Sequence, residues 1–145
     1  MQSVLNEVDG QSIVSLTEDN DAYRRIVYSG DHMQITLNTL RHGDAIPFEI
    51  HEDTDQYIEC VSGLIAVATA HESPPPLSRS KTVLGDGDVY VVPAGTPHKI
   101  ANWSPGTEEA KFYTIYGGRP LHPVPCETKI GDAGNPPPTG SLGML

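Results

Sequence analysis

The chain has 145 residues, which suits a single domain with a sizeable core. Its 14 glycines and 13 prolines favour short strands and many turns over long helices. The formal net charge of -10 argues against nucleic acids and anionic membrane surfaces as partners. The sequence shows neither a basic, apolar leader nor a window as long as a membrane span, so we expect a soluble, cytoplasmic protein.

Short apolar runs separated by turn-forming residues make up most of the chain. Residues 1–22 are mainly polar, with one short apolar patch at 13–16. Three consecutive prolines at 74–76 predict an exposed loop over 70–80. A long helical period is absent from the sequence, and the spacing of strands and turns predicts an all-β sandwich or barrel. The expected strands are 25–28, 33–40, one on each side of the polar turn 51–55, 64–69, 82–84, 89–92, 98–102 and 111–116.

The two cysteines do not form a disulfide framework. Cys60 lies in an apolar strand pattern, and Cys126 lies in a proline-flanked tail. The sequence is compatible with one disulfide, but two free thiols in a reducing compartment are the simpler interpretation.

Residues 43–63 carry the side chains around which we expect the function to be organised. Glu49 and His51 are two residues apart, so in a strand they project from the same face. A polar turn follows, and the strand that leaves it would bring Gln56 back beside this pair. His98, at the start of a later strand, supplies a fourth group. Imidazole nitrogens and side-chain oxygens suit one divalent transition metal, which could be Zn, Fe, Ni or Mn.

The spacing of this segment resembles the first motif of the cupin superfamily, usually written G-x5-H-x-H-x(3,4)-E-x6-G. Gly43, Glu49, His51, Gln56 and Gly63 stand at the five motif positions. Glu49 replaces the first histidine, and Gln56 replaces the glutamate. The spacing itself fits throughout.

The second cupin motif, G-x5-P-x-G-x2-H-x3-N, fits without a departure. Its positions are occupied by Gly87, Pro93, Gly95, His98 and Asn102. Pro93 and Gly95 shape the turn between two strands, and Asn102 is most simply a strand-end residue that satisfies backbone groups. Together the two motifs make a strong resemblance.

The resemblance covers roughly residues 12–130 and extends to small single-domain cupins of the mannose-6-phosphate isomerase-like kind. It implies a double-stranded β-helix (jelly-roll) barrel, commonly a homodimer, with one metal held by Glu49, His51, Gln56 and His98. We therefore divide the chain into three parts. These are an N-terminal extension with the first strand (1–22), a cupin barrel (23–120) and a Pro/Gly-rich tail (121–145) that is extended or disordered unless it docks.

The ligand set leaves several functions open. The first is a metal-dependent enzyme on a small molecule, most simply a sugar or sugar-phosphate isomerase, because a neutral Gln56 keeps the site more positive and a better Lewis acid than a glutamate would. Two imidazoles and a carboxylate also resemble the facial triad of non-haem Fe(II) dioxygenases. A metal-stabilised, non-catalytic binding module is a third possibility, and a barrel without metal is a fourth.

An isomerase also needs a group that transfers a proton. Tyr113, Tyr116 and His122 are the candidates, because we expect all three on inward faces of the barrel. Three cationic residues could hold an anionic substrate: Arg25, Lys99 and Arg119.

Overall fold

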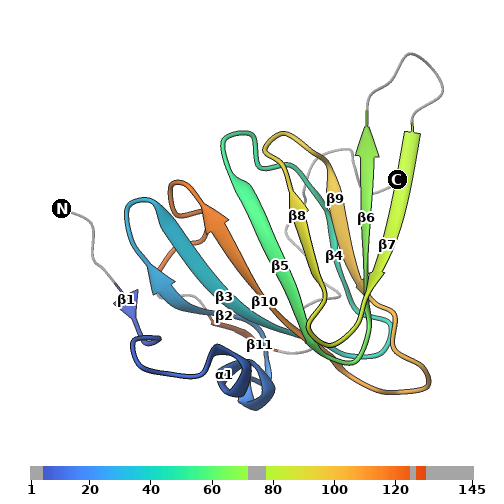
Figure 1. Cartoon of the computed structure of the whole chain (residues 1–145), viewed down its shortest axis with the longest axis horizontal. Helices are drawn as coiled ribbons and strands as arrows, with labels where there is room; N and C mark the ends of the chain where they lie inside the picture. The colour runs from blue at the N-terminus through green and yellow to red at the C-terminus, as the bar shows by residue number, and fades with distance from the viewer. Residues whose placement is uncertain (1–4, 72–77, 125–126, 130–145) are drawn as a thin grey trace.

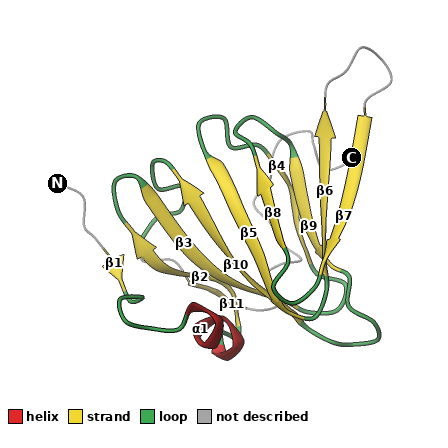
Figure 2. Ribbon diagram, in the orientation of Figure 1, coloured by secondary structure: helices red, strands yellow, loops and turns green. Residues whose placement is uncertain are grey.

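The computed structural model describes residues 5–71, 78–124 and 127–129, and it consists almost entirely of antiparallel strands (Figure 1; Figure 2). The expected all-β jelly roll is confirmed. In chain order the elements are β1 (Leu5–Asn6), α1 (Ile13–Asp19), β2 (Ala22–Ser29), β3 (Met33–Leu40), β4 (Ala45–Glu49), β5 (Asp55–Ser62), β6 (Ile65–His71), β7 (Ser78–Leu84), β8 (Val89–Val92), β9 (His98–Asn102), β10 (Ala110–Gly117) and β11 (Glu127–Lys129).

Two sheets face each other in the described part of the chain. The larger sheet has the order β1-β2-β3-β10-β5-β8, with β11 also paired to β2, and the smaller has the order β4-β9-β6-β7. From β4 to β6 and from β8 to β10, consecutive strands alternate between the sheets, as expected of a jelly roll. The sheets converge at one end, at the bottom of Figure 1, and diverge at the other.

The main core lies between the sheets, because alternate residues of each strand point inward. Its buried side chains are Tyr23, Leu40, Ile46, Ile58, Cys60, Ile65, Val67, Leu84, Val92, Ile100, Ala110 and Phe112. Cys60 is a free thiol, as interpreted from the sequence, and burial raises its pKa to about 11. Cys126 lies outside the described residues.

A second apolar cluster lies on the outer face of the larger sheet, where helix α1 covers β3, β5 and β10. Ile13 and Leu16 of the helix pack against Leu37 and Tyr113 of the sheet. The side chain of Ser12 caps the helix by accepting a hydrogen bond from the Ser15 backbone N–H at 3.1 Å. From the sequence only an apolar patch was expected here, because seven residues are too few to establish a helical period.

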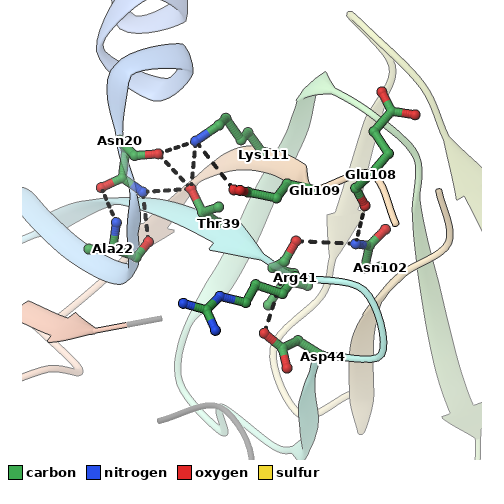
Figure 3. Close-up of polar contacts among 10 residues, drawn as sticks. Asn20, Ala22, Thr39, Arg41, Asp44, Asn102, Glu108, Glu109 and Lys111 are labelled. Carbon is green, nitrogen blue, oxygen red and sulfur yellow. Dashed lines mark hydrogen bonds and ion pairs between the residues drawn. The ribbon is translucent and has the colours of Figure 1, made fainter. Parts of the chain in front are cut away.

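The C-terminal end of α1 is held to the sheet by a polar cluster (Figure 3). The Asn20 side chain donates to the Ala22 carbonyl at 2.8 Å and to Thr39 Oγ1 at 3.1 Å. The Asn20 carbonyl accepts from both Thr39 Oγ1 and Lys111 Nζ. These bonds fix the start of β2 relative to β3 and β10.

Asn102 satisfies backbone groups at the end of β9, as the sequence analysis proposed. Its Nδ2 donates to the carbonyls of Leu40 at 3.1 Å and Glu108 at 2.9 Å (Figure 3). Its Oδ1 accepts from the Ser104 backbone N–H at 2.8 Å. A side chain with both donors and an acceptor can therefore tie three chain segments together.

The expectation for residues 70–84 needs correction. Strand β6 continues to His71 and β7 begins at Ser78, so both ends of the expected loop 70–80 are strand, and the expected short strand 82–84 is longer. The residues with the consecutive prolines lie outside the described ones. Within the expected C-terminal tail, residues 127–129 form β11, which pairs with β2, so this part of the tail is extended and docked, as the expectation allowed. No helix in the described ranges is long and apolar enough to cross a membrane.

The two glycines that bound the first motif have different structural roles. Both have a positive φ, +82° at Gly43 and +71° at Gly63. A Cβ at Gly63 would lie 2.5 Å from the Glu109 carbonyl oxygen and 2.6 Å from Ser104 Oγ, whereas a Cβ at Gly43 would meet nothing within 4 Å. Gly63 is therefore required for close packing as well as for backbone conformation.

We expect Gly63→Ala to lower the free energy of unfolding by about 3 kcal/mol or more, because backbone strain and a steric clash add. The matched control Gly43→Ala carries only the strain and should lose about 1 kcal/mol. Urea unfolding followed by circular dichroism measures both. Equal losses in the two variants would contradict the close approach at Gly63.

Candidate metal centre

Strand pairing brings the expected ligands to one end of the barrel. Glu49 ends β4 and pairs with His98, which begins β9. Gln56, near the start of β5, pairs with Tyr116 near the end of β10. His51 follows β4 by two residues, and its ring lies edge-on to Tyr116 with the centroids 5.5 Å apart. These strand ends lie where the sheets diverge, in the upper part of Figure 1.

Glu49, His51 and His98 form a group that could hold a metal ion. One ligand atom from each lies within 4.8 Å of the others, and the two imidazole centroids are 5.1 Å apart. In a tetrahedral site, two ligands at ~2.1 Å from one ion lie ~3.4 Å apart. The ligand atoms therefore need to approach one another by no more than ~1.4 Å to share an ion.

His98 is oriented as a nitrogen ligand. Its Nδ1 lies 2.9 Å from the Thr96 carbonyl oxygen, which can only accept, so Nδ1 carries the proton and Nε2 presents a lone pair. Burial lowers the pKa of His98 and so favours this neutral form. Its Nε2 is buried and has no hydrogen-bond partner, and the same is true of His51 Nε2.

Gln56 presents an oxygen in the same way. Its Nε2 donates to Thr114 Oγ1 at 2.9 Å, which fixes the orientation of the amide. Its Oε1 is buried without a hydrogen-bond partner. Gln56 is 1% exposed, so bulk solvent does not reach this oxygen.

Glu49 provides the negative charge of the group. Burial on its own would raise the pKa of Glu49, but His51, Arg24 and His98 outweigh burial and hold this pKa below its usual value. His51 Nε2 lies 3.6 Å from Glu49 Oε1, which is longer than a hydrogen bond. A carboxylate, two imidazoles and an amide oxygen are a donor set that fits a divalent transition metal.

Of the proton-transfer candidates, Tyr116 and His122 lie beside this group. The Tyr116 ring contacts both His51 and His122, with the centroids of Tyr116 and His122 5.4 Å apart. The Tyr116 hydroxyl is 3.5 Å from His122 Nε2. Burial raises the pKa of Tyr116, and burial together with Arg24 lowers the pKa of His122 to about 4. Both side chains are therefore neutral near neutral pH.

Gln34 positions His122, and the sequence analysis did not recognise it. The buried Gln34 side chain accepts from the backbone N–H groups of Leu121 and His122, at 3.2 and 3.0 Å. Its Nε2 donates to the His122 carbonyl at 3.0 Å and to Ser29 Oγ at 3.1 Å. The only sequence signal is a long polar residue at an inward position of β3, and this signal does not identify its partner.

Tyr113 is not part of the site, contrary to the expectation that it faces inward. Tyr113 and Tyr116 are three residues apart on β10, so they project from opposite faces of the strand. Tyr113 belongs to the cluster under helix α1, and its hydroxyl donates to Glu59 Oε1 at 2.8 Å.

The three expected anion-binding residues lie in different places. Arg25 is on the outside of the barrel, where it pairs with Glu7 at 2.8 Å. Lys99 lines a cavity of about 350 Å³ on the outer face of the smaller sheet. Only Arg119 is near the candidate site, because it lines a cavity of about 690 Å³ that His51 also lines. This cavity is the mouth of the site.

Arg24 is a further cation that the sequence analysis missed. It pairs with Asn38 on the inner face of the larger sheet, and its charge affects the pKa values of Glu49, Tyr116 and His122. Its neighbour Arg25 was the residue considered from the sequence. In the run Tyr-Arg-Arg-Ile-Val-Tyr, apolar and polar residues do not alternate regularly, and the strand register shifts within β2. The sequence therefore does not show which of the two arginines faces inward.

Comparison with known proteins identifies the family. The family described as "Cupin domain" matches residues 36–116, which run from β3 to β10 and include all four expected ligands. The chain belongs to the cupin family. The narrower mannose-6-phosphate isomerase-like group stays a prediction.

Three relatives illustrate what this cupin resembles. An uncharacterized protein of Acanthamoeba polyphaga mimivirus is 37% identical over 116 residues, which are 80% of this chain and 69% of that protein. A crystal structure from Bacillus halodurans is 30% identical, with a TM-score of 0.72 and coverage of 86% of this chain and 90% of that one. Quercetin 2,3-dioxygenase of Bacillus subtilis is 32% identical over 89 residues, which are 61% of this chain and only 24% of that enzyme.

We expect the purified cupin to bind one divalent transition-metal ion per chain. His51→Ala and His98→Ala each remove a nitrogen ligand and should weaken binding by at least ~100-fold. His42→Ala, which changes an exposed histidine in a turn, is the control and should bind like the wild type. Metal titration and elemental analysis measure the effect, and unchanged metal content in both ligand variants would rule out this site.

We also expect His122 to make stability depend on pH. The folded state protonates His122 near pH 4 and the unfolded state near pH 6.5, so the unfolded state binds more protons as the pH falls between these values. The loss attributable to His122 at pH 4.5 is about 2 kcal/mol. His122→Asn should lack this part of the loss, and His42→Asn should retain it. Urea titrations at pH 4.5 and 7 measure the difference, and identical pH profiles for His122→Asn and wild type would contradict it.

Proposed function

We propose that this cupin is a metal-dependent enzyme that acts on a small molecule, and that sugar or sugar-phosphate isomerisation is the favoured reaction. The observation that carries the proposal is the contact of the Tyr116 and His122 pair with the ligand group. An isomerase needs both a site that polarises a carbonyl or hydroxyl oxygen and a neighbouring group that moves a proton. Tyr116, which touches His51, would place the proton-transfer pair next to the polarised oxygen.

Glu49, His51, Gln56 and His98 would hold the metal. A bound divalent ion supplies Lewis-acid polarisation of a substrate oxygen. Because Gln56 is neutral, the ligand set contributes only the single negative charge of Glu49, which leaves more of the positive charge to act on the substrate.

Tyr116 and His122 would carry the proton. His122 is neutral near neutral pH, so an unprotonated nitrogen is available to accept a proton. Tyr116 keeps its hydroxyl proton because burial raises its pKa, so it can donate. The 3.5 Å between Tyr116 Oη and His122 Nε2 is slightly longer than a good hydrogen bond and would need to shorten when substrate binds.

A second candidate is an Fe(II) dioxygenase. Similarity to quercetin 2,3-dioxygenase of Bacillus subtilis supports it, although this chain spans about a quarter of that enzyme. Two histidines and one carboxylate are also the ligands of the facial-triad iron enzymes. Metal identity and oxygen consumption separate the two reactions.

For the isomerase, we expect the metal-loaded protein to exchange a substrate C–H hydrogen with deuterium when sugar phosphates are incubated in deuterated water. Tyr116→Phe should slow this exchange by ~100-fold or more, because it removes the hydroxyl of the proton-transfer pair. Tyr113→Phe is the matched control on the same strand and should exchange at the wild-type rate. Nuclear magnetic resonance or mass spectrometry of the substrate measures the exchange.

Other outcomes would change the assignment. Purification with iron, together with oxygen uptake on candidate substrates, would support the dioxygenase. Metal-loaded protein whose melting temperature rises with a small molecule that is never converted would support a binding module instead. Equal exchange rates in Tyr116→Phe and Tyr113→Phe would exclude the proposed proton path.

A further inference from the structure

Arg24 points into the barrel, whereas Arg25 points out. Arg24 pairs with Asn38, and paired residues of neighbouring strands share a face. Asn38 and Leu40 are two residues apart on β3, and Leu40 belongs to the core between the sheets, so this face is the interior. Arg25 pairs instead with Leu37, which lies in the cluster under helix α1.

The guanidinium of Arg24 has an unsatisfied donor. Its Nε is buried and has no hydrogen-bond partner. Among the described residues, carboxylates lie within 4.0 Å of Arg25, His51 and Lys111, but none lies that close to Arg24. Arg24 as a whole is half-buried, and its guanidinium lies over the Tyr23 ring, with Cζ 5.6 Å from the ring centroid. The Nε–H is therefore the donor that remains for a ligand to satisfy.

The charge balance of the interior indicates the sign of that ligand. The nearby candidate ligands contribute one carboxylate, Glu49, and otherwise neutral groups. A divalent ion together with Arg24 therefore leaves the interior with an excess of positive charge, although the chain as a whole is strongly negative. An anion would balance that excess where neutral sugars would not.

Arg24 and the proton-transfer pair share the interior of the barrel. Arg24 pairs with Asn38 and Tyr116 pairs with Gln34, and these two residues of β3 are four positions apart on one face of the strand. The Gln34 side chain also holds the backbone of His122. A substrate bound beside Tyr116 therefore lies on the same inner face as Arg24.

We infer that Arg24 is the residue that binds an anionic group of the substrate, a carboxylate or a phosphate, inside the barrel. This inference rests on the proposed function of the same site and narrows its substrate class to small oxyanions. The planar guanidinium matches both groups, because its N–H donors can engage two oxygens at once. The buried Nε–H is one of these donors.

Isothermal titration of the metal-loaded protein with malonate and with inorganic phosphate tests the inference. We expect Arg24→Gln to weaken binding by 10-fold or more, because a charge-assisted hydrogen bond is lost. Arg24→Lys keeps the positive charge but lacks the planar pair of N–H donors, so it should recover part of the affinity. Arg25→Gln is the matched control on the neighbouring residue and should bind within twofold of wild type.

The two anions separate the sources of the oxyanion. A loss confined to malonate would identify a carboxylate substrate, and a loss confined to phosphate would identify a phosphorylated one. Equal affinity in Arg24→Gln and wild type would overturn the inference. So would a wild-type protein that binds neither anion more tightly than neutral malonamide.

Failure of this inference can be distinguished from failure of the proposed function. Metal content and circular dichroism of each variant show whether the fold and the metal ligands are intact, and Arg24→Lys replaces Arg24→Gln if the latter does not fold. Anion binding that depends on Arg24 without any turnover would support the inference and contradict the enzyme. Turnover of neutral sugars at equal rates in Arg24→Gln and wild type would support the enzyme and overturn the inference.

Discussion

Burying a hydrogen-bonding atom without a partner costs on the order of 1–3 kcal/mol, and of the four such side-chain atoms among the described residues, three belong to candidate metal ligands. His51 Nε2, Gln56 Oε1 and His98 Nε2 are all buried and all lack a hydrogen-bond partner. Two of these side chains are oriented by a hydrogen bond through their other polar atom, His98 to the Thr96 carbonyl and Gln56 to Thr114. The fold thus fixes the direction of these lone pairs and leaves them without a hydrogen-bond donor. A bound metal ion would supply the missing partner.

The jelly-roll pairing makes this concentration of lone pairs possible. Antiparallel strands place the end of one strand beside the start of the next, so Glu49 meets His98 and Gln56 meets Tyr116 although the partners are about 50 or more residues apart. The apolar core occupies the converging end of the same interior, where the side chains between the sheets are aliphatic and aromatic. Packing at one end therefore supports a polar site at the other.

Much of this arrangement could be predicted from the sequence, because motif spacing encodes strand position. The strands 33–40, 89–92 and 98–102 have the expected bounds, and Glu49, His51 and His98 come together as the two cupin motifs imply. The predictions that were wrong concerned which face of a strand or helix a side chain projects from. Tyr113 was expected inside the barrel because the sequence does not determine which alternate residues of β10 face inward. Helix α1 was not predicted because seven residues are too few to show a helical repeat.

Long-range polar contacts were the other part that the sequence could not supply. Gln34 and His122 are 88 residues apart, and nothing in either local pattern indicates that one side chain holds the other's backbone. Arg24 and Arg25 are chemically identical, and only the pairing with β3 separates them. Such contacts follow from register, which local propensity does not determine.

The segment after β10 combines two tasks. Arg119, Pro120 and Leu121 form part of the rim of the mouth cavity, and the next residue, His122, touches Tyr116. Gln34 fixes the backbone between the rim and His122 by accepting hydrogen bonds from the N–H groups of Leu121 and His122. Widening the entrance by remodelling this rim would therefore displace the imidazole as well, so the size of molecule admitted and the alignment of the base cannot evolve independently. Redesign for bulkier compounds would do better to begin at Glu52, which is exposed and lines the same cavity.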